Sequence, residues 1–169
     1  MNFTLRPFRP ADAASLAKQA NNPNIARFMT DGFPHPFTLE RAQGFIKVST
    51  SIDPIRIRAI EMDGEIAGAI GIHPQEDIMC KNAELGYWLA EPFWGRGIMT
   101  EAIKQTIDYG FQNWDIDRIF ARPFGSNIGS QRALEKAGFK LEAKFEKTIF
   151  KNGQYEDEWV YAVRRDNRF

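Results

Sequence analysis

A strand that runs into a glycine-rich turn and then into a helix is the feature that most constrains how this sequence folds. The apolar run 85–90 has the composition of a buried strand, and a helical pattern of apolar residues begins at Met99. Between them, Gly95 and Gly97 allow backbone N–H groups to turn toward one point, where the positive end of the helix dipole adds to them. We therefore expect this turn to bind a phosphate or pyrophosphate group.

Two common nucleotide-binding motifs do not fit this turn. A P-loop requires Gly-Lys followed by Ser or Thr, whereas this chain reads Gly97-Ile98-Met99. A dinucleotide-binding fingerprint requires a third glycine at the position of Thr100. The turn is therefore expected to serve a phosphorylated cofactor of another class.

The composition indicates a single globular domain over residues 1–169. Hydrophobic residues make up 43% of the chain and include 14 Phe, which is enough for a proper core. Lys and Arg together number 22, as do Asp and Glu, so the charge gives no support for binding nucleic acid or a membrane surface. The single cysteine, Cys80, excludes an intramolecular disulfide, and no signal peptide or membrane span is visible. We expect a cytoplasmic, reducing location.

The spacing of apolar residues predicts alternating strands and helices. Strands are expected at residues 3–8, 55–62, 65–72, 81–90, 118–122, 139–150 and 154–163. Helices are expected at residues 13–20, 23–29, 38–50, 99–113 and 127–137. Asp63-Gly64 and Asn152-Gly153 are signals for two-residue hairpin turns. This order predicts an α/β (α+β) fold with a mixed, mostly antiparallel central sheet and helices on both faces.

Four short motifs in this order resemble the GNAT superfamily of N-acetyltransferases, and the resemblance covers residues 3–163. The motifs are Leu5-Arg6-Pro7, Glu84-Leu85-Gly86-Tyr87-Trp88-Leu89, Trp94-Gly95-Arg96-Gly97 and Leu134-Glu135-Lys136-Ala137-Gly138-Phe139. The family's acetyl-CoA pyrophosphate loop, Gln/Arg-x-x-Gly-x-Gly/Ala, falls on residues 94–99, with Met99 in place of the small last residue. Trp94 in the first position resembles the branch that acetylates protein N-termini, especially those of ribosomal proteins. The resemblance implies the GNAT fold and acetyl-CoA as co-substrate.

The resemblance also implies which residues bind acetyl-CoA. The backbone of residues 87–89 would pair with the pantetheine arm like an added strand, and residues 95–100 would wrap the pyrophosphate. Asn127 would bind pantetheine, although its position also suits a helix N-cap. Arg132 and Lys136 would lie near the adenine-phosphate end, with solvated helix charges as the alternative. The expected cofactor-binding residues are Tyr87, Trp88, Leu89, Gly95, Arg96, Gly97, Ile98, Met99, Thr100, Asn127, Arg132 and Lys136.

Direct acetyl transfer to an amine requires a group that accepts the ammonium proton and a group that reprotonates the leaving thiolate. By resemblance, Ser130 in the pattern Asn-x-x-Ser is the candidate acid, with a capping contact as the alternative. Glu84 is the candidate base, acting through ordered water. The alternative for Glu84 is a carboxylate paired with Lys81 or with an arginine, and the sequence leaves both interpretations open.

The resemblance places the acceptor wall in an aromatic region that precedes the third helix. The expected substrate-binding residues are Phe28, Phe33, His35 and Phe37, with loop packing as the alternative. The acidic run 156–158 would suit a cationic acceptor, although ordinary solvated strand charges also explain it. No metal site is expected, because the two histidines are isolated and Cys80 has no partner spacing.

The sequence thus predicts an acetyl-CoA-dependent N-acetyltransferase acting by direct attack of an amine on the thioester. The expected acceptor is a protein N-terminus, as in the ribosomal-protein branch. A small amine such as a polyamine, an amino acid or an antibiotic is the alternative, and a non-catalytic CoA-binding module is a third. We expect an amine acceptor as partner and neither nucleic acid nor membrane. The oligomeric state stays open, with a homodimer suggested by the resemblance.

Overall fold

The computed structural model describes residues 2–168 and contains one mixed sheet of seven strands over that range. The strand order is β1-β2-β3-β4-β5-β7-β6. β4 pairs with β5 in parallel, whereas β1–β2, β2–β3, β5–β7 and β6–β7 are antiparallel, which confirms the predicted mixed, mostly antiparallel sheet. The strands are β1 (Thr4–Arg6), β2 (Ile57–Met62), β3 (Glu65–Pro74), β4 (Asn82–Leu89), β5 (Arg118–Ala121), β6 (Lys140–Lys151) and β7 (Gln154–Arg164).

The helices follow the predicted order. They are α1 (Ala13–Ala20), α2 (Pro23–Ala26), α3 (Leu39–Ser49), α4 (Ile98–Asn113) and α5 (Ile128–Lys136). None of these helices combines the length and the apolar character that a membrane span needs, as far as residues 2–168 are concerned.

Two elements, β1 and α2, are each three residues shorter than the sequence predicts, a larger difference than in any other element. β1 ends at Arg6, because Pro7 has no N–H to donate to a neighbouring strand. α2 is one turn that ends at Ala26, whereas the prediction extended to residue 29. Beyond it, the N–H groups of Phe28 and Met29 bond to carbonyls three residues earlier, so the chain tightens into turns of the 3₁₀ type and leaves the α-helix.

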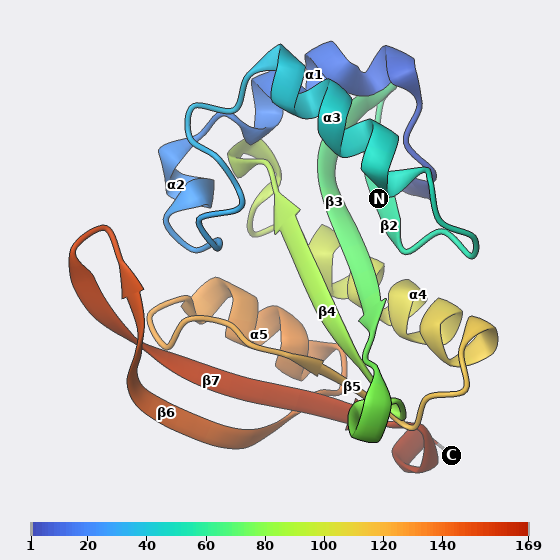
Figure 1. The fold of residues 1–169 in the computed structure, drawn as a ribbon, viewed down its shortest axis with the longest axis vertical. Helices are drawn as coiled ribbons and strands as arrows, with labels where there is room; N and C mark the ends of the chain where they lie inside the picture. The colour runs from blue at the N-terminus through green and yellow to red at the C-terminus, as the bar shows by residue number, and fades with distance from the viewer. Residues whose placement is uncertain (1, 169) are drawn as a thin grey trace. The chain divides into compact units, whose positions relative to one another are not determined.

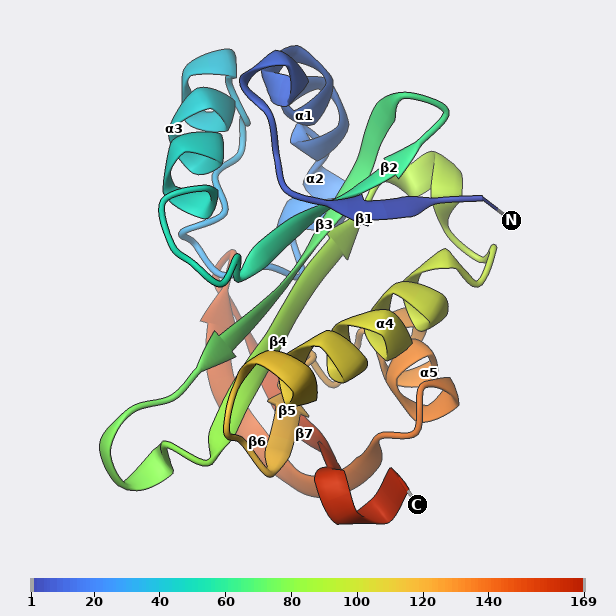
Figure 2. The ribbon, with the colours of Figure 1, turned by 90° about the vertical axis from the view of Figure 1, so that its right-hand side faces the viewer.

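Close contacts divide the chain into two units, to both of which β3 and β4 contribute residues. The first unit comprises Met1–Gly71 and Tyr87–Ile98, and the second comprises Ile72–Gly86 and Met99–Phe169. In the first unit, α1 and α3 lie side by side and pack against β2 and β3 (Figure 1, Figure 2). The two helices and two strands bury small and aliphatic side chains together, among them Leu16, Ala20, Ala42, Ile46, Ala59, Ile66 and Ala69.

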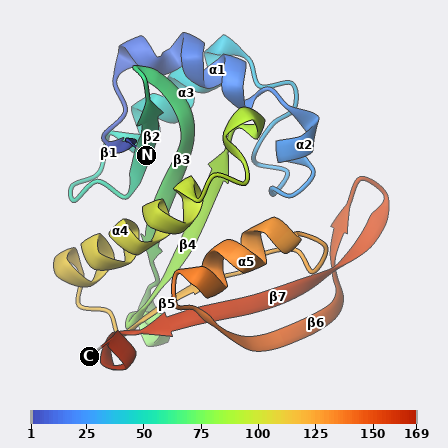
Figure 3. The ribbon, with the colours of Figure 1, turned by 180° about the vertical axis from the view of Figure 1, so that it is seen from behind.

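In the second unit, α5 runs beside the long hairpin formed by β6 and β7 (Figure 3). The hydroxyl of the buried Tyr161 on β7 donates a hydrogen bond to Glu135 on α5 at 3.0 Å. α4 approaches β3 closely at Gly110, where a Cβ would stand 2.3 Å from the Cδ1 of Ile72. These contacts hold α5 on β7 and α4 on β3.

Candidate functional site

The glycine-rich turn has the backbone conformation that the sequence predicts for an anion site. Gly95 and Gly97 have φ values of 70° and 76°, and α4 begins directly after them at Ile98. A Cβ built on either glycine meets no atom within 4 Å. Glycine is therefore required here by the positive φ and not by crowding, and the space beside the turn is open to a ligand. These residues fit a pyrophosphate held at a helix N-terminus.

The residues around the turn are held by contacts within the first unit. Trp94 is 42% exposed, and its indole N–H donates to the carbonyl oxygen of Leu89 at 2.7 Å. The guanidinium of Arg96 lies over the ring of Phe93, 5.6 Å from its centre. Ile98 is fully buried and anchors the first turn of α4. The segment between β4 and α4 is therefore held by contacts among its own residues, and the two glycines lie at its exposed end.

At the end of the strand predicted to carry the pantetheine arm, two side chains are buried and one is half-buried. Trp88 and Leu89 are buried, and Tyr87 is half-buried. Gly68 on β3 lies so close to this strand that a Cβ would stand 2.3 Å from the carbonyl oxygen of Trp88. The N–H of Ala90 donates to Ala67 at 2.7 Å, which continues the contact between the two strands. Pairing of the backbone of residues 87–89 with a ligand stays a prediction.

The corner at the start of α5 has the capping geometry that was the alternative interpretation for Asn127. The Asn127 side-chain oxygen accepts from the N–H of Ser130 at 3.2 Å, so Asn127 is the N-cap of α5. Ser130 is half-buried in the first turn of that helix. Arg132 and Lys136 are exposed on the same helix, one turn apart. Met99 and Thr100, also in the second unit, are half-buried in the first turn of α4.

Gln131 is a residue of this corner that sequence reasoning missed. Its side chain is 5% exposed, and its amide donates to the carbonyls of Phe124 at 3.1 Å and Gly125 at 2.9 Å. On the opposite side, the N–H of Gly125 donates to the carbonyl of Asp157 on β7 at 2.8 Å. The loop before Asn127 is therefore held from two sides. A glutamine in a helical pattern gives no sequence signal for such a role.

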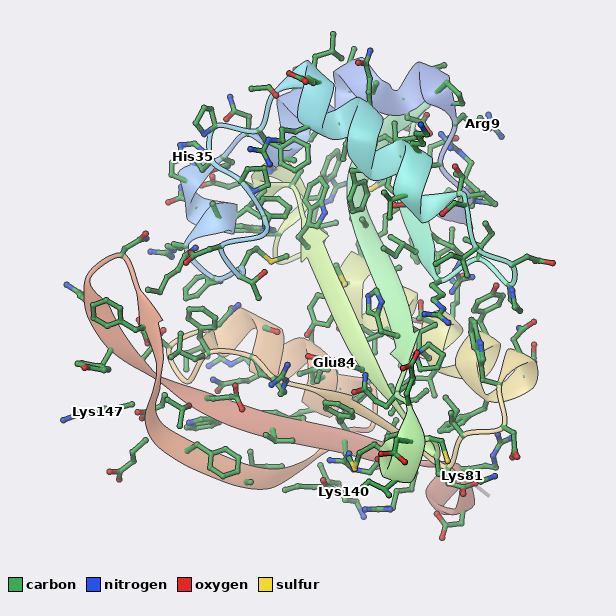
Figure 4. The ribbon with its side chains drawn as sticks, viewed as in Figure 1. Arg9, His35, Lys81, Glu84, Lys140 and Lys147 are labelled. Atoms are coloured by element: carbon green, nitrogen blue, oxygen red, sulfur yellow. The ribbon has the colours of Figure 1, made fainter. Side chains whose placement is uncertain are left out.

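Glu84 lies on β4 (Figure 4). It makes an ion pair with an arginine, which was the second of its two interpretations. Arg122 donates from Nε to Glu84 Oε1 at 2.9 Å and from Nη2 to Oε2 at 3.2 Å. Lys81, the other partner considered, pairs instead with Asp115 at 2.6 Å. The hydrogen bonds to Glu84 outweigh burial and raise the pKa of Arg122 above its ordinary value. Sequence reasoning did not identify Arg122, because a residue just past a short strand carries no motif.

The predicted acceptor residues fall into two groups. Phe37 is 5% exposed and belongs to the core, and Phe33 contacts both Phe37 and Trp88 at ring distances of 5.2 and 5.9 Å. These two aromatics are therefore brought together by packing. Phe28 lies under the guanidinium of Arg27 at 4.5 Å, and His35 is exposed on its loop (Figure 4).

Each residue of the acidic run has a partner within the second unit. Glu156 accepts from the hydroxyl of Ser126 at 2.8 Å, and Asp157 accepts from the N–H of Lys147 at 2.9 Å. Glu158 lies 3.8 Å from Nη1 of Arg122. Across residues 2–168 the structure shows no group of three or more His, Cys, Asp or Glu side chains suited to a metal ion.

Comparison with known proteins agrees with this geometry. Residues 2–140 match the model of the acetyltransferase (GNAT) domain. The chain is similar to the probable N-acetyltransferase YjcK of Bacillus subtilis, with 37% identity over 101 residues, which is 60% of this chain and 56% of that protein. The matched part thus spans about half the length of that relative.

Two further relatives, both from Escherichia coli, differ in the acceptors that they are named for. The ribosomal-protein-serine acetyltransferase is 31% identical over 100 residues, covering 59% of this chain and 55% of that protein. The spermidine N(1)-acetyltransferase is 26% identical over 157 residues, covering 89% and 80%.

A solved structure shares the whole architecture. The microcin C7 self immunity acetyltransferase MccE, in complex with acetyl-CoA and AMP, superposes with a TM-score of 0.80 and 26% identity over 96% of this chain and 92% of that one. These matches confirm the predicted fold, and they confirm the predicted family, whose acetyl-group donor is acetyl-CoA. The chain belongs to the GNAT family of acetyltransferases.

Proposed function

We propose that this protein transfers the acetyl group of acetyl-CoA to a primary amine. The observation that carries the proposal is the turn at Gly95 and Gly97, with two positive φ values, open space beside both glycines and the N-terminus of α4 directly behind them. Backbone N–H groups and a helix dipole at one point suit a pyrophosphate. Membership of the GNAT family supports acetyl-CoA as the molecule that carries this pyrophosphate.

In this proposal each group of residues predicted from the sequence binds a different part of acetyl-CoA. The backbone of residues 87–89 binds the pantetheine arm, and the N–H of Trp88 or Leu89 faces the thioester oxygen. Residues 95–100 wrap the pyrophosphate, with Arg96 adding positive charge. Asn127 serves pantetheine in addition to capping α5, and Arg132 and Lys136 serve the adenine-phosphate end. The exposure of Arg132 and Lys136 on one side of α5 supports the last assignment.

Acetyl-CoA supplies a thioester, whose carbonyl carbon forms the new bond to the amine nitrogen while the bond to sulfur breaks. Glu84 accepts the proton that the ammonium group must lose, through an ordered water. Arg122 occupies one acceptor site on each oxygen of Glu84, and a carboxylate has about four such sites, so others remain for a water. Ser130 donates its hydroxyl proton to the leaving sulfur and regains one through water from the nitrogen, which loses its second proton as the amide forms, while the proton on Glu84 passes to solvent. No covalent enzyme intermediate is needed.

The proposed acceptor is a protein N-terminus. The relative named as a ribosomal-protein-serine acetyltransferase and the tryptophan at position 94 support it. A polyamine is the second candidate, because the relative named for spermidine matches 89% of the chain, a larger share than the ribosomal relative does. The two acceptors differ in that spermidine carries several ammonium groups, whereas a peptide N-terminus carries one next to an amide.

Calorimetric titration with acetyl-CoA tests the cofactor site. We expect the parent to bind and Gly97→Glu to lose affinity by about 100-fold or more, since the new carboxylate repels the pyrophosphate and its backbone resists the positive φ. Gly153→Glu is the matched control, because Gly153 has φ 77° and equally open space in the turn between β6 and β7. Absence of binding by a folded parent, or equal binding by both variants, would contradict the proposed site.

A thiol-release assay then distinguishes the acceptors. Peptides that begin with Ala or Ser are compared with spermidine at the same concentration, with acetyl-CoA saturating. Faster CoA release with the peptides supports an N-terminal acetyltransferase, and faster release with spermidine supports the polyamine alternative. Tight acetyl-CoA binding without release in either case would indicate a binding module and contradict the proposed catalysis.

A further inference from the structure

Three charged side chains of the second unit form a cluster centred on Arg122. Its guanidinium makes a fork with both oxygens of Glu84, and its third nitrogen lies 3.8 Å from the carboxylate of Glu158. The last distance is too long for a hydrogen bond, so Glu158 attracts the guanidinium by charge alone. The side chains of Glu84 and Arg122 are 30% and 47% exposed, so the cluster lies at the surface of its unit.

Glu84 lies on β4, Glu158 lies on β7, and Arg122 directly follows β5, the strand between them, which fixes their spacing. Glu84 pairs with Phe120 in the parallel register of β4 and β5, and Phe120 pairs with Ala162 on β7. Just beyond Arg122, the carbonyl of Pro123 accepts from the N–H of Trp159, which continues the pairing along β7. The backbone on both sides of Arg122 is therefore held, and its side chain reaches Glu84 on one side and Glu158 on the other.

The two hydrogen bonds from Arg122 determine the orientation of the Glu84 carboxylate in addition to balancing its charge. A glutamate has three rotatable side-chain bonds, and a half-exposed glutamate without a partner populates several rotamers. Two parallel N–H donors fix both the position of the carboxylate and the rotation of its plane. An ion pair this exposed contributes little to stability, so its loss changes the orientation of Glu84 without unfolding the chain.

We propose that Arg122 is a positioning residue for acetyl transfer, which fixes the carboxylate plane of Glu84 while Glu158 holds the far end of the guanidinium. The inference rests on the proposed function, in which Glu84 takes the proton of the amine. Arg122 itself touches neither substrate in this scheme and acts only through Glu84.

A double-mutant cycle separates an effect through Glu84 from an independent one. We expect Arg122→Ala to lower kcat by about 10-fold, because a misplaced catalytic group costs one to two orders of magnitude, and to leave KM for acetyl-CoA within about twofold. Glu84→Gln lowers kcat by about 100-fold. In the Glu84→Gln background, Arg122→Ala causes no further loss. If the two losses multiply instead, Arg122 does not act through Glu84, and the proposal is wrong.

Two further variants distinguish the effect of the paired hydrogen bonds from the effects of the positive charge and of overall stability. Arg122→Lys keeps the charge and loses the fork, so we expect it to recover less than half of the lost kcat. Arg118→Ala is the control in β5, the strand that ends directly before Arg122, and Arg118 makes an ion pair with Glu142 at 2.6 Å. It should lower the melting temperature and leave kcat unchanged. Full recovery by lysine, or an equal loss of kcat in Arg118→Ala, would overturn the proposal.

Chemical rescue distinguishes a positioning role from a purely structural one, because added guanidinium would not raise kcat if Arg122 only stabilised the fold. Guanidinium chloride at about 10 mM, far below the molar range in which it unfolds proteins, should raise kcat of Arg122→Ala severalfold and have no such effect on Arg118→Ala. If Arg122→Ala keeps the parental kcat and guanidinium does not raise it, the positioning role is wrong, and the proposed function is not affected. A parent that releases no CoA with peptides or spermidine would contradict the proposed function, and the positioning role would fall with it.

Discussion

The indole N–H of Trp94 donates a hydrogen bond to the carbonyl oxygen of Leu89, and the two atoms are 2.7 Å apart. Leu89 is the last residue of β4, and Trp94 directly precedes the first glycine of the turn. The bond therefore closes the segment between the strand and the turn. Because Trp94 is partly exposed, this contact and not burial holds its ring in place.

Replacing Trp94 should weaken the proposed binding of acetyl-CoA without abolishing it. Trp94→Phe keeps a flat ring and removes the N–H, so we expect acetyl-CoA to bind about fivefold more weakly, in line with about 1 kcal/mol for one hydrogen bond. Calorimetry measures the change. The control is Trp114→Phe, whose ring packs against Tyr109 at the end of α4 and which should bind like the parent. Parental affinity in Trp94→Phe would show that the bond does not order the turn.

The loop before α5 should be sensitive to a single methyl group. A Cβ at Gly125 would stand 2.9 Å from Nε1 of Trp159 and 3.0 Å from Cβ of Asp157, so Gly125→Ala must displace the loop. We expect a loss of about 1–3 kcal/mol in the free energy of unfolding and a lower kcat, because Asn127 and Ser130 follow this loop. Urea unfolding and the thiol-release assay measure the two effects.

Gly129→Ala is the matched control for Gly125→Ala. Gly129 lies in the first turn of α5, and only the Asn127 side chain, at 4.0 Å, lies near its added Cβ. Alanine should stabilise the helix by up to about 1 kcal/mol. Equal stability changes in the two variants would mean that the loop adapts freely.

The buried ion pair between Arg6 and Asp12 should make the stability of the first unit decrease at acidic pH. The Arg6 guanidinium donates to both oxygens of Asp12 at 2.8 Å and also contacts Glu61. Burial by itself raises the pKa of Asp12, but hydrogen bonds from Arg6 and from the N–H of Arg9 outweigh it and hold the pKa below its ordinary value. The stabilisation is therefore complete above the pKa of an unfolded-chain Asp, about 4, and is lost as pH falls through the folded-state pKa.

Asp12→Asn tests this pH dependence. At pH 7 we expect the variant to be about 3 kcal/mol less stable than the parent, because it leaves a buried guanidinium without its charged partner. The difference between the two proteins should begin to shrink below about pH 4, where Asp12 protonates in the unfolded parent, and should continue to shrink as the pH falls through the lower pKa of the folded state. Asp115→Asn, which removes the exposed partner of Lys81, should leave stability nearly unchanged at every pH. A difference for Asp12→Asn that does not depend on pH would contradict the assignment.

Arg165 should stabilise the C-terminal end of α4. Its guanidinium donates to the carbonyls of Phe111 at 3.0 Å and Ile116 at 2.7 Å, and it lies over the Phe111 ring. Arg165→Ala should cost about 1–2 kcal/mol of unfolding free energy, since carbonyls at a helix end lose a charged donor. The neighbouring Arg164 makes one contact of 3.4 Å to Glu142, and Arg164→Ala should change little by comparison.

Local signals in the sequence predicted most elements, because the structures that they specify are local. Asp63-Gly64 and Asn152-Gly153 adopt positive φ values in the turns between β2 and β3 and between β6 and β7, as these dipeptides require. Gly95 and Gly97, in the turn before α4, also adopt positive φ values. α2 was predicted too long, because its apolar spacing continued beyond the single turn that the hydrogen bonds allow.

The sequence by itself determined the element order and the turn at Gly95 and Gly97, since backbone conformation depends on the residue at each position and its nearest neighbours. The tertiary structure alone decided the partner of Glu84. Arg122 stands 38 residues away and reaches Glu84 only through the parallel register of β4 and β5. Because side chains alternate between the two faces of a sheet, a shift of that register by one residue would turn Arg122 to the opposite face. Periodicity along one chain contains no information on the register between two strands, so no motif could identify this pair.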